Sequence, residues 1–382
     1  MKVKGWRNIK LLGATSFLTD VSSEIMHSVL PFFIVSLGGG GLIVGVIGGL
    51  GDVISNIFKV ISGYISDKIR RCKSIVALGY FISSLSKLLL SFSTSWLHVM
   101  VIRPVERIGK GIRTAPRDAL IAASIDESQR GRAFGLHRAL DTAGAILGVI
   151  LAIALLKFLG EAYNQILLIA GIIAFTALIP LAFVEEAKVE KRRMRETARI
   201  PLRTWIVIIV MTIFAVGNFT YMLFLLRGES FFTGEMRLIG PIVLYLIFNI
   251  LYTVTAYPAG ALADKIGKHW ATVMGYILYG VSCLGLAMKI NLVAGIAMFI
   301  LYGASYGFFD GVQRALISDL SPPEARGTVL GVFHSLTGFG TLAGSIIAGL
   351  MWETMGWNWT FMFGAVLALT SALTLAVVTV KG

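Results

Sequence analysis

Long apolar runs separated by short polar links make up most of the chain. A transmembrane helix needs about 20 apolar residues, whereas a barrel strand needs only about 10 with strict alternation. The runs here are long and continuous, so the pattern predicts an all-α integral membrane protein with twelve transmembrane helices. The expected helices are 9–37, 42–65, 74–94, 96–120, 133–158, 163–184, 204–227, 238–262, 270–289, 293–317, 328–350 and 357–380.

The longest polar link lies at the midpoint of the chain, over residues 185–203. It is rich in lysine and arginine and leaves six predicted helices on each side. We therefore expect an N-terminal six-helix bundle over 1–184, a basic cytoplasmic linker over 185–203 and a C-terminal six-helix bundle over 204–382.

Composition narrows the class of protein. Only 14% of the 382 residues are charged and 56% are hydrophobic, whereas a soluble domain carries about 25% charge. This disfavours a soluble enzyme, a disordered chain and a disulfide-stapled secreted domain. The segment around Gly109-Lys110-Gly111 lacks the frame of a phosphate-binding loop, and no zinc-protease motif occurs. We expect no enzymatic activity, no cofactor and no metal.

The net charge of +13 is distributed unevenly along the chain. Lysines and arginines gather before the first predicted helix, between the second and third, in the central link and after the eighth. By the positive-inside rule, both termini and the central link face the cytoplasm, which predicts a multi-pass protein of the cell membrane. The basic link is expected to contact anionic lipid heads and not nucleic acid.

The two halves of the chain repeat each other. Gly63-Tyr-Ile-Ser-Asp67-Lys68 follows the second predicted helix, and Gly260-Ala-Leu-Ala-Asp264-Lys265 follows the eighth, 197 residues later. Two copies that enter the membrane from the same side are parallel repeats, which allow one half to rock against the other around a central cavity.

This repeated loop motif, in a chain of six plus six helices with a basic middle link, resembles the major facilitator superfamily. The N-terminal copy departs from the family pattern, because Arg70 stands where the family has glycine and Cys72 replaces a basic residue. Asp20-x-x-Ser23-Glu24 and the stretch from Arg103 to Asp118 are similar to a poorly characterised group of prokaryotic permeases.

The resemblance implies two pseudo-symmetric bundles, a cavity lined by helices one, four, seven and ten, and alternating access. It also implies a conformational latch at the two loops; the alternative is ordinary positive-inside loops. The glycines would allow close helix approach, and the aspartate would favour a helix N-terminus. The expected latch residues are Gly63, Asp67, Lys68, Arg71, Gly260, Asp264 and Lys265.

Three ionisable residues of the first predicted helix share one face. Asp20, Glu24 and His27 are spaced i, i+4, i+7, and such groups inside a membrane are functional candidates because their burial is costly. One interpretation is a proton site, with the acid desolvated and its charge compensated by Arg103 or Arg107. The others are a divalent-cation site, which the facing cations disfavour, and a structural ion-pair network.

The fourth predicted helix carries a stripe of charges on a face roughly 140° wide. The stripe suits proton coupling or an anionic substrate group, while its lower cations are alternatively snorkelling to the surface. Asp118 is expected to pair with Arg117 or Arg113, and Arg138 with Asp141, while no partner is predicted for Lys87. The stripe consists of Arg103, Glu106, Arg107, Lys110, Arg113 and Arg117.

The C-terminal half carries few interior charges and many aromatic residues on helices seven and ten. Such a surface suits the body of an amphipathic organic molecule, although aromatic packing is an equally simple explanation. Together with His27, Glu106 and Lys110 of the N-terminal half, the residues predicted to line a substrate cavity are Asn218, Tyr221, Tyr306, Asp310 and Arg314.

These patterns predict a secondary active transporter that exports a small organic solute in exchange for protons, by alternating access and as a monomer. Proton symport or uniport of an organic anion is an alternative. A non-transporting membrane receptor or scaffold is another, which the paired latch and the facing charges disfavour because neither is needed unless the halves move.

Overall fold

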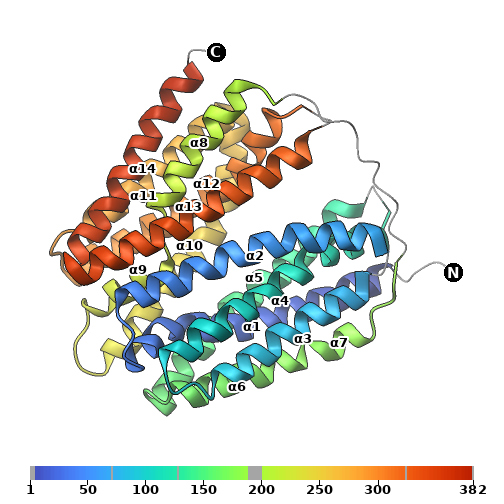
Figure 1. Ribbon diagram of the computed structural model, residues 1–382, viewed down its shortest axis with the longest axis horizontal. Coiled ribbons are helices and arrows are strands. Elements are labelled where there is room, and N and C mark those ends of the chain that lie inside the picture. Colours follow the sequence, from blue (N-terminus) through green and yellow to red (C-terminus); the bar gives the residue numbers. More distant parts are fainter. Residues whose placement is uncertain (1–4, 70–71, 127–128, 188–199, 323–324, 381–382) are drawn as a thin grey trace. The chain divides into compact units, whose positions relative to one another are not determined.

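The computed structural model describes residues 5–69, 72–126, 129–187, 200–322 and 325–380 (Figure 1). Regular secondary structure in these ranges is helical, and no strand occurs in them. The helices are α1 (Gly5–Ser36), α2 (Gly41–Ile69), α3 (Cys72–Leu90), α4 (Trp96–Ser124), α5 (Arg130–Leu159), α6 (Tyr163–Thr176), α7 (Leu178–Ala182), α8 (Leu202–Gly217), α9 (Tyr221–Glu229), α10 (Met236–Ile266), α11 (Lys268–Leu286), α12 (Leu292–Asp319), α13 (Arg326–Thr354) and α14 (Trp357–Val380).

The predicted all-α membrane architecture is confirmed. Ten helical segments in the described part are long and apolar enough to cross a membrane. The spans of α4 and α11 are not among these segments, because α4 carries the charge stripe and α11 begins with Lys268 and His269. The pair α6 and α7 occupies the sixth predicted span, and the pair α8 and α9 the seventh.

The sixth span is interrupted only at Ala177, whose φ of −64° and ψ of −22° stay in the helical region. The seventh span is divided in two by a non-helical residue, so the prediction of a continuous helix is wrong there. In the seventh span, α8 ends at Gly217, and Asn218 leaves the helical region with φ −89° and ψ 68°. The hydroxyl of Thr220 then accepts a hydrogen bond from the Met222 N–H at 3.4 Å and caps α9. Glycine and asparagine are weak helix formers, which makes this position the easiest place to interrupt the span.

Tertiary contacts stabilise the break between α8 and α9. The Tyr279 hydroxyl on α11 donates a hydrogen bond to the Gly217 carbonyl at 3.0 Å. The Thr220 N–H donates to the hydroxyl of Ser345 on α13, also at 3.0 Å. Irregular backbone at membrane depth is tolerated where the protein itself satisfies the freed polar groups, as it does here.

The chain forms two compact units. Unit 1 comprises Met1–Gly38 and Ile54–Arg193, and unit 2 comprises Gly39–Val53 and Met194–Gly382. Helix α2 therefore contributes its first part to unit 2 and its second part to unit 1. The expected bundle boundary at 185–203 stays a prediction, because residues 188–199 of that link lie outside the described ranges.

In unit 1, α1 packs against α5 and α6, and α3 packs against α4 and α6 (Figure 1). Helix α1 is buried along most of its length. One apolar cluster joins Ile9 and Leu12 of α1 to Cys72, Val76 and Tyr80 of α3. Because α1 is enclosed by its neighbours, its polar residues face protein and not lipid.

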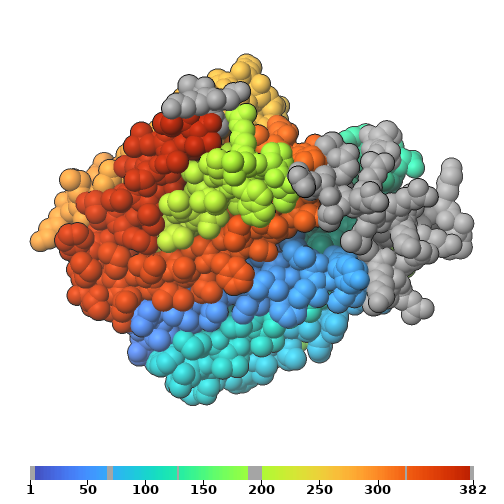
Figure 2. Space-filling model, turned by 45° about the horizontal axis from the view of Figure 1, so that its top comes forward, coloured from blue at the N-terminus to red at the C-terminus, as the bar shows by residue number. Residues whose placement is uncertain are grey.

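In unit 2, α8 lies at the surface beside α13 and α14 (Figure 2). Its exposed stripe consists of Leu202, Ile206, Ile209 and Ile213, while Phe214 turns inward. Apolar residues on both faces of one helix suit a protein whose outer surface contacts lipid. Unit 2 is completed by α10 and α11, both of which pack against α12.

Arg227, at the end of α9, is expected to be a structural clamp. Its guanidinium donates hydrogen bonds to the carbonyls of Leu286 at 3.0 Å and Met288 at 2.8 Å, and to Ser230. It also lies 3.6 Å from the ring centroid of Trp357. The carbonyls are the unsatisfied groups at the end of α11, which a planar guanidinium can bridge.

The variant Arg227→Lys is therefore expected to lower the free energy of unfolding by about 1–3 kcal/mol, because an ammonium cannot hold both carbonyls. Thermal unfolding of the purified protein, followed by modification of the buried thiol of Cys283 on α11, measures the effect. An unchanged transition would contradict the clamp. Arg237→Lys is the control, since Arg237 is 68% exposed and pairs only with Glu229 in the described part of the chain.

Candidate functional site

The predicted N-terminal site residues gather in unit 1, on α1 and α4, with further groups from α3 and α5. We call this set the unit 1 charge cluster. It consists of Asp20, Glu24, His27, Lys87, Arg103, Glu106, Arg107, Lys110, Arg113 and Asp141.

Glu106 is the centre of the tightest ion pair in the cluster. One carboxylate oxygen accepts a hydrogen bond from the Arg103 guanidinium at 2.6 Å and lies 3.8 Å from Arg107 Nε. The other oxygen accepts from the Ser83 hydroxyl at 3.1 Å. Arg103 and Glu106 are each 1% exposed. Glu106 was predicted to line a cavity, and the structure places it between two guanidinium groups, where it holds their charges inside the bundle.

Ser83 reaches Glu106 because α3 and α4 approach each other closely. An added Cβ at Gly109 of α4 would lie 2.7 Å from the carbonyl oxygen of Gly79 and from the N–H of Ser83. A glycine at this position therefore sets the distance between the two helices.

Lys87, for which the sequence suggests no partner, joins α3 to α1. Its ammonium donates hydrogen bonds to the hydroxyls of Ser23 at 2.8 Å and Ser22 at 3.2 Å. The Ser22 hydroxyl in turn donates to the Ala170 carbonyl of α6 at 2.6 Å. In the sequence, Lys87 stands out only as a lysine within an apolar span. Its serine partners on another helix can be identified only from the tertiary structure.

Glu24 and His27 interact on α1, as their spacing allows. The His27 ring nitrogen Nδ1 lies 3.2 Å from the Glu24 carboxylate. His27 is buried and Glu24 half-buried. The pair supplies two groups that can exchange a proton, one turn away from Asp20.

Asp20 hydrogen-bonds the carboxyl group of Asp141 on α5. The positive charges of Lys110 and Arg113 on α4 interact electrostatically with the Asp20 carboxyl group. Asp141 also lies 3.4 Å from Arg138, the pair that the sequence predicted. The contact between the two aspartates was not predicted, because 121 residues separate them along the chain and only the packing of α1 on α5 brings them together.

The lower cations of α4 point into unit 1. Arg113 is 4% exposed and lies 4.5 Å from the ring centroid of Tyr80. Arg117 pairs with Asp118 at 3.1 Å and donates a hydrogen bond to the Ser16 hydroxyl at 3.1 Å. The snorkelling interpretation is therefore wrong for Arg113, which is enclosed by protein.

The site residues predicted in the C-terminal half lie in unit 2 among stacked aromatic rings. The Tyr306 hydroxyl donates a hydrogen bond to the Asn218 side-chain carbonyl at 2.9 Å, beside the break in the seventh span. Tyr221 stacks on Tyr245 with a centroid distance of 5.4 Å. The same group of rings includes Phe248, whose centroid lies 5.3 Å from that of Tyr306.

Asp310 and Arg314 pair on α12 at 3.0 Å. The hydroxyl of Tyr252 on α10 donates to the same Asp310 oxygen at 2.9 Å. Tyr252 belongs to this group although the sequence did not single it out, because its spacing is that of an ordinary aromatic residue in an apolar helix.

The predicted latch residues lie on helices and not in loops. Gly63, Asp67 and Lys68 fall within α2, while Gly260, Asp264 and Lys265 fall within α10. Arg71 lies outside the described residues. A Cβ added at Gly63 would lie 3.5 Å from the Cβ of Ala115, an ordinary van der Waals distance. A Cβ added at Gly260 would have no described atom within 4 Å. Neither glycine is required for a close approach in this structure.

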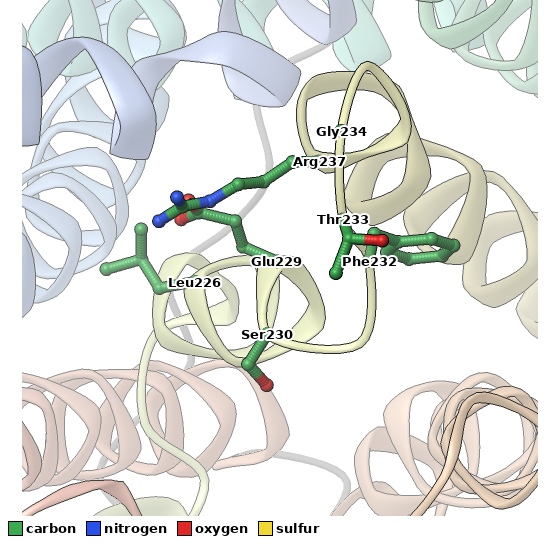
Figure 3. Close-up of a pocket in the computed structure, with 7 residues that line it drawn as sticks. All are labelled: Leu226, Glu229, Ser230, Phe232, Thr233, Gly234 and Arg237. Carbon is green, nitrogen blue, oxygen red and sulfur yellow. The ribbon is translucent and has the colours of Figure 1, made fainter.

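A pocket of about 510 Å³ lies elsewhere in unit 2, between the end of α9 and the start of α10 (Figure 3). In Figure 3 the side chains of Glu229 and Arg237 point toward each other across it, and they form an ion pair of 2.6 Å. None of the residues predicted to bind substrate lines this pocket.

No three His, Cys, Asp or Glu side chains in the described ranges are grouped closely enough to hold a metal ion. The divalent-cation interpretation of Asp20, Glu24 and His27 therefore gains no support from the geometry. The cations of the cluster outnumber its acids, which disfavours a metal ion and suits an organic anion better.

Comparison with known proteins agrees with this architecture. A family model described as the Major Facilitator Superfamily matches residues 12–239 and 240–381. An uncharacterized MFS-type transporter of Methanocaldococcus jannaschii is 45% identical over 97% of this chain and 94% of its own. The proton-coupled antiporter flippase LtaA of Staphylococcus saprophyticus is 22% identical over 81% of this chain and 78% of its own. The crystal structure of the nucleoside transporter NupG superposes with a TM-score of 0.80 and 16% identity, covering 97% of this chain and 99% of that one.

Proposed function

Because the chain belongs to the major facilitator superfamily, we propose that it is a secondary active transporter that exports a small organic solute in exchange for protons. The observation that carries this proposal is the unit 1 charge cluster. Acids and cations inside a membrane bundle are costly, and they are found where ions or substrates pass.

The acids of α1 are suited to proton exchange. Asp20 contacts a second carboxyl group, and Glu24 contacts an imidazole. Each arrangement allows one group to gain or lose a proton while its neighbour compensates. The relative named as a proton-coupled antiporter flippase supports the same mode of coupling.

Unit 2 supplies a surface of a different kind for the body of the solute. Tyr221, Asn218 and Tyr306 place aromatic faces and a side-chain amide beside the break in the seventh span. Aromatic walls with a few fixed polar groups are typical of sites for organic molecules. We propose that unit 1 handles the proton and that unit 2 binds the solute.

Flux measurements in proteoliposomes test the proposal. Purified protein is given an imposed pH gradient and a panel of fluorescent amphipathic cations and organic anions. We expect at least one probe to move against its gradient as protons move down theirs. Glu24→Gln is expected to lower this flux by about tenfold or more, because the amide cannot take up and release a proton as a carboxyl group does.

The control for this experiment is Glu185→Gln, because Glu185 is 42% exposed and pairs with Arg7 outside the cluster. It should transport as the unmodified protein does. Flux that is unchanged in both Glu24→Gln and Asp20→Asn would exclude proton coupling through α1.

Proton symport of an organic anion is a second candidate function. The excess of cations in the cluster favours it, because guanidinium groups bind carboxylates and phosphates. In the same vesicles this alternative predicts that an organic anion accumulates in the direction of the proton gradient, whereas the antiporter moves its solute the other way.

We also propose that the ends of α2 and α10 act as the conformational latch, through Gly63, Asp67, Lys68 and Arg71 in the first copy and Gly260, Asp264 and Lys265 in the second. The repeat of acid and base at equivalent helix ends supports this role. From the distribution of lysine and arginine along the chain we also propose that both termini face the cytoplasm of the cell, where anionic lipid heads contact the basic link.

A further inference from the structure

Asp20 of α1 and Asp141 of α5 lie within hydrogen-bonding reach of each other where the two helices pack together. An ionised carboxylate only accepts hydrogen bonds, so such a contact requires one proton. Two carboxylates held together cannot both remain charged without a large repulsion. Two carboxyl groups in this contact therefore favour sharing one proton.

The helix packing holds the two residues in register. Helices α1 and α5 lie side by side (Figure 1), and an added Cβ at Gly148 of α5 would lie 3.0 Å from the Cα of Val21. One turn before the acid pair, the Ser16 hydroxyl lies 2.9 Å from the Nε2 atom of His137. Ser16 precedes Asp20 by four residues and His137 precedes Asp141 by four, so both contacts recur on one face of each helix.

Ser16 is the centre of a buried polar group below the acid pair. Besides His137, its hydroxyl contacts the Tyr80 hydroxyl at 3.2 Å and accepts a hydrogen bond from Arg117 at 3.1 Å. Ser16, Tyr80 and His137 are all buried. Hydroxyl and imidazole groups both donate and accept, so this group can pass a proton along its hydrogen bonds.

The cations of α4 stabilise the negative charge that the pair gains when it loses its proton. Arg113 acts on Asp20, and its Nη1 atom has no hydrogen-bond partner among the described residues although the side chain is 4% exposed. When the proton leaves, the second carboxylate charge is stabilised by the field of this buried guanidinium.

We propose that Asp20 and Asp141 form a single protonation site, in which one proton is shared by the two carboxyl groups and is exchanged through His137 and Ser16. The proposal rests on the proposed function, since it names the residues that carry the coupled proton. His137 takes up a proton at one ring nitrogen and releases one from the other. The carboxyl pair receives it across one helical turn, about 5–6 Å, which a water molecule bridges.

Charged and titratable groups of α3, α4 and α5 face this site. Their mixture of signs allows the site to titrate without leaving an isolated charge in the bundle. They are Lys87 of α3, Lys110, Arg113, Arg117 and Asp118 of α4, and His137 and Arg138 of α5.

Infrared difference spectroscopy tests the shared proton without a substrate. The purified full-length protein in lipid vesicles is titrated with acid and alkali, and the carbonyl band of protonated carboxyl groups is recorded. We expect one band that disappears at high pH and shifts in heavy water. Asp20→Asn and Asp141→Asn should each abolish it, because the amide can donate a hydrogen bond to the remaining carboxylate but has no carboxyl proton to titrate.

Asp319→Asn is the matched control and should leave the band intact, since Asp319 is 55% exposed and pairs with Lys268 in unit 2, outside the site. A band that survives in both Asp20→Asn and Asp141→Asn, with normal helix content and a monodisperse elution profile, would overturn the shared site. Absence of any titrating band in the unmodified protein would do the same.

The relay is tested by the rate at which the band appears after a rapid drop in pH. His137→Gln should keep the band and slow its appearance by at least about tenfold. An unchanged rate would remove His137 from the relay. If solute flux ignores a pH gradient while the band behaves as described, the coupling is refuted and the protonation site stands, so the two proposals fail separately.

Discussion

The variant Glu106→Ala is expected to lower the free energy of unfolding of the protein by about 3–5 kcal/mol, the cost of leaving a buried charge without its partner. Glu106 accepts a 2.6 Å hydrogen bond from Arg103 and lies 3.8 Å from Arg107, and both guanidinium groups are buried. Without the carboxylate, two positive charges remain next to each other and cannot reach water. The bundle then relaxes by partial opening around α4.

Cys72 reports this opening directly. It is a free, buried thiol at the start of α3, the helix that packs against α4. The rate at which a maleimide dye modifies Cys72 on heating, in a background with Cys283 replaced by serine, measures the stability of unit 1. We expect the transition of Glu106→Ala to move to markedly lower temperature.

Two further variants separate charge from packing. Arg103→Met combined with Glu106→Met removes both partners of the closest pair and should restore part of the lost stability. Asp118→Ala removes a carboxylate from a more exposed pair and should cost about 1 kcal/mol or less. If Glu106→Ala unfolds like the unmodified protein, Glu106 does not compensate the guanidinium groups, and its role must be sought in binding alone.

The variant Gly344→Leu is expected to destabilise unit 2 by about 3 kcal/mol or more, because overpacking of a tight helix contact forces the backbone apart. An added Cβ at Gly344 of α13 would overlap the carbonyl oxygen of Val216 on α8. This contact lies just before the break in the seventh span. Separating α13 from α8 would also pull Ser345 from the Thr220 N–H that it satisfies.

Gly331→Leu is the control on the same helix, since no described atom lies within 4 Å of a Cβ added there. Its effect should stay within about 0.5 kcal/mol. Modification of Cys283, in a background with Cys72 replaced by serine, follows the unfolding of unit 2. Equal stability of the two leucine variants would show that α13 does not pack on α8 as described.

Hydropathy along the chain was sufficient to predict the class of fold. Continuous apolar runs of about 20 residues have one stable solution in a membrane, because a lipid-exposed backbone must satisfy its own hydrogen bonds. The twelve spans and their order follow from that rule. Their ends were less predictable: the second and eighth helices were expected to end at residues 65 and 262, yet α2 continues to Ile69 and α10 to Ile266.

The break at Asn218 shows where local pattern fails. Nothing in the apolar run from Leu202 to Glu229 demands an interruption, and its average hydropathy suits an unbroken helix. The interruption depends on Tyr279 and Ser345, which satisfy the freed backbone groups from other helices. Such support cannot be detected from the sequence of one segment alone.

The candidate site divides in the same way. The stripe on α4 and the acids of α1 stand out in the sequence, because a charge in an apolar span needs an explanation wherever it lies. Their partners on other helices do not stand out. Lys87 finds two serines of α1, and Asp20 finds Asp141 of α5, through contacts between helices that no spacing rule within a segment describes.

Composition and periodicity thus determine which segments leave water, since burial of an apolar run depends only on its own side chains. The packing of the helices determines which buried charges meet. A helix face is set by the 3.6-residue repeat, but the neighbour it contacts is set by the register between helices, where single glycines such as Gly109 and Gly148 determine how close two backbones come.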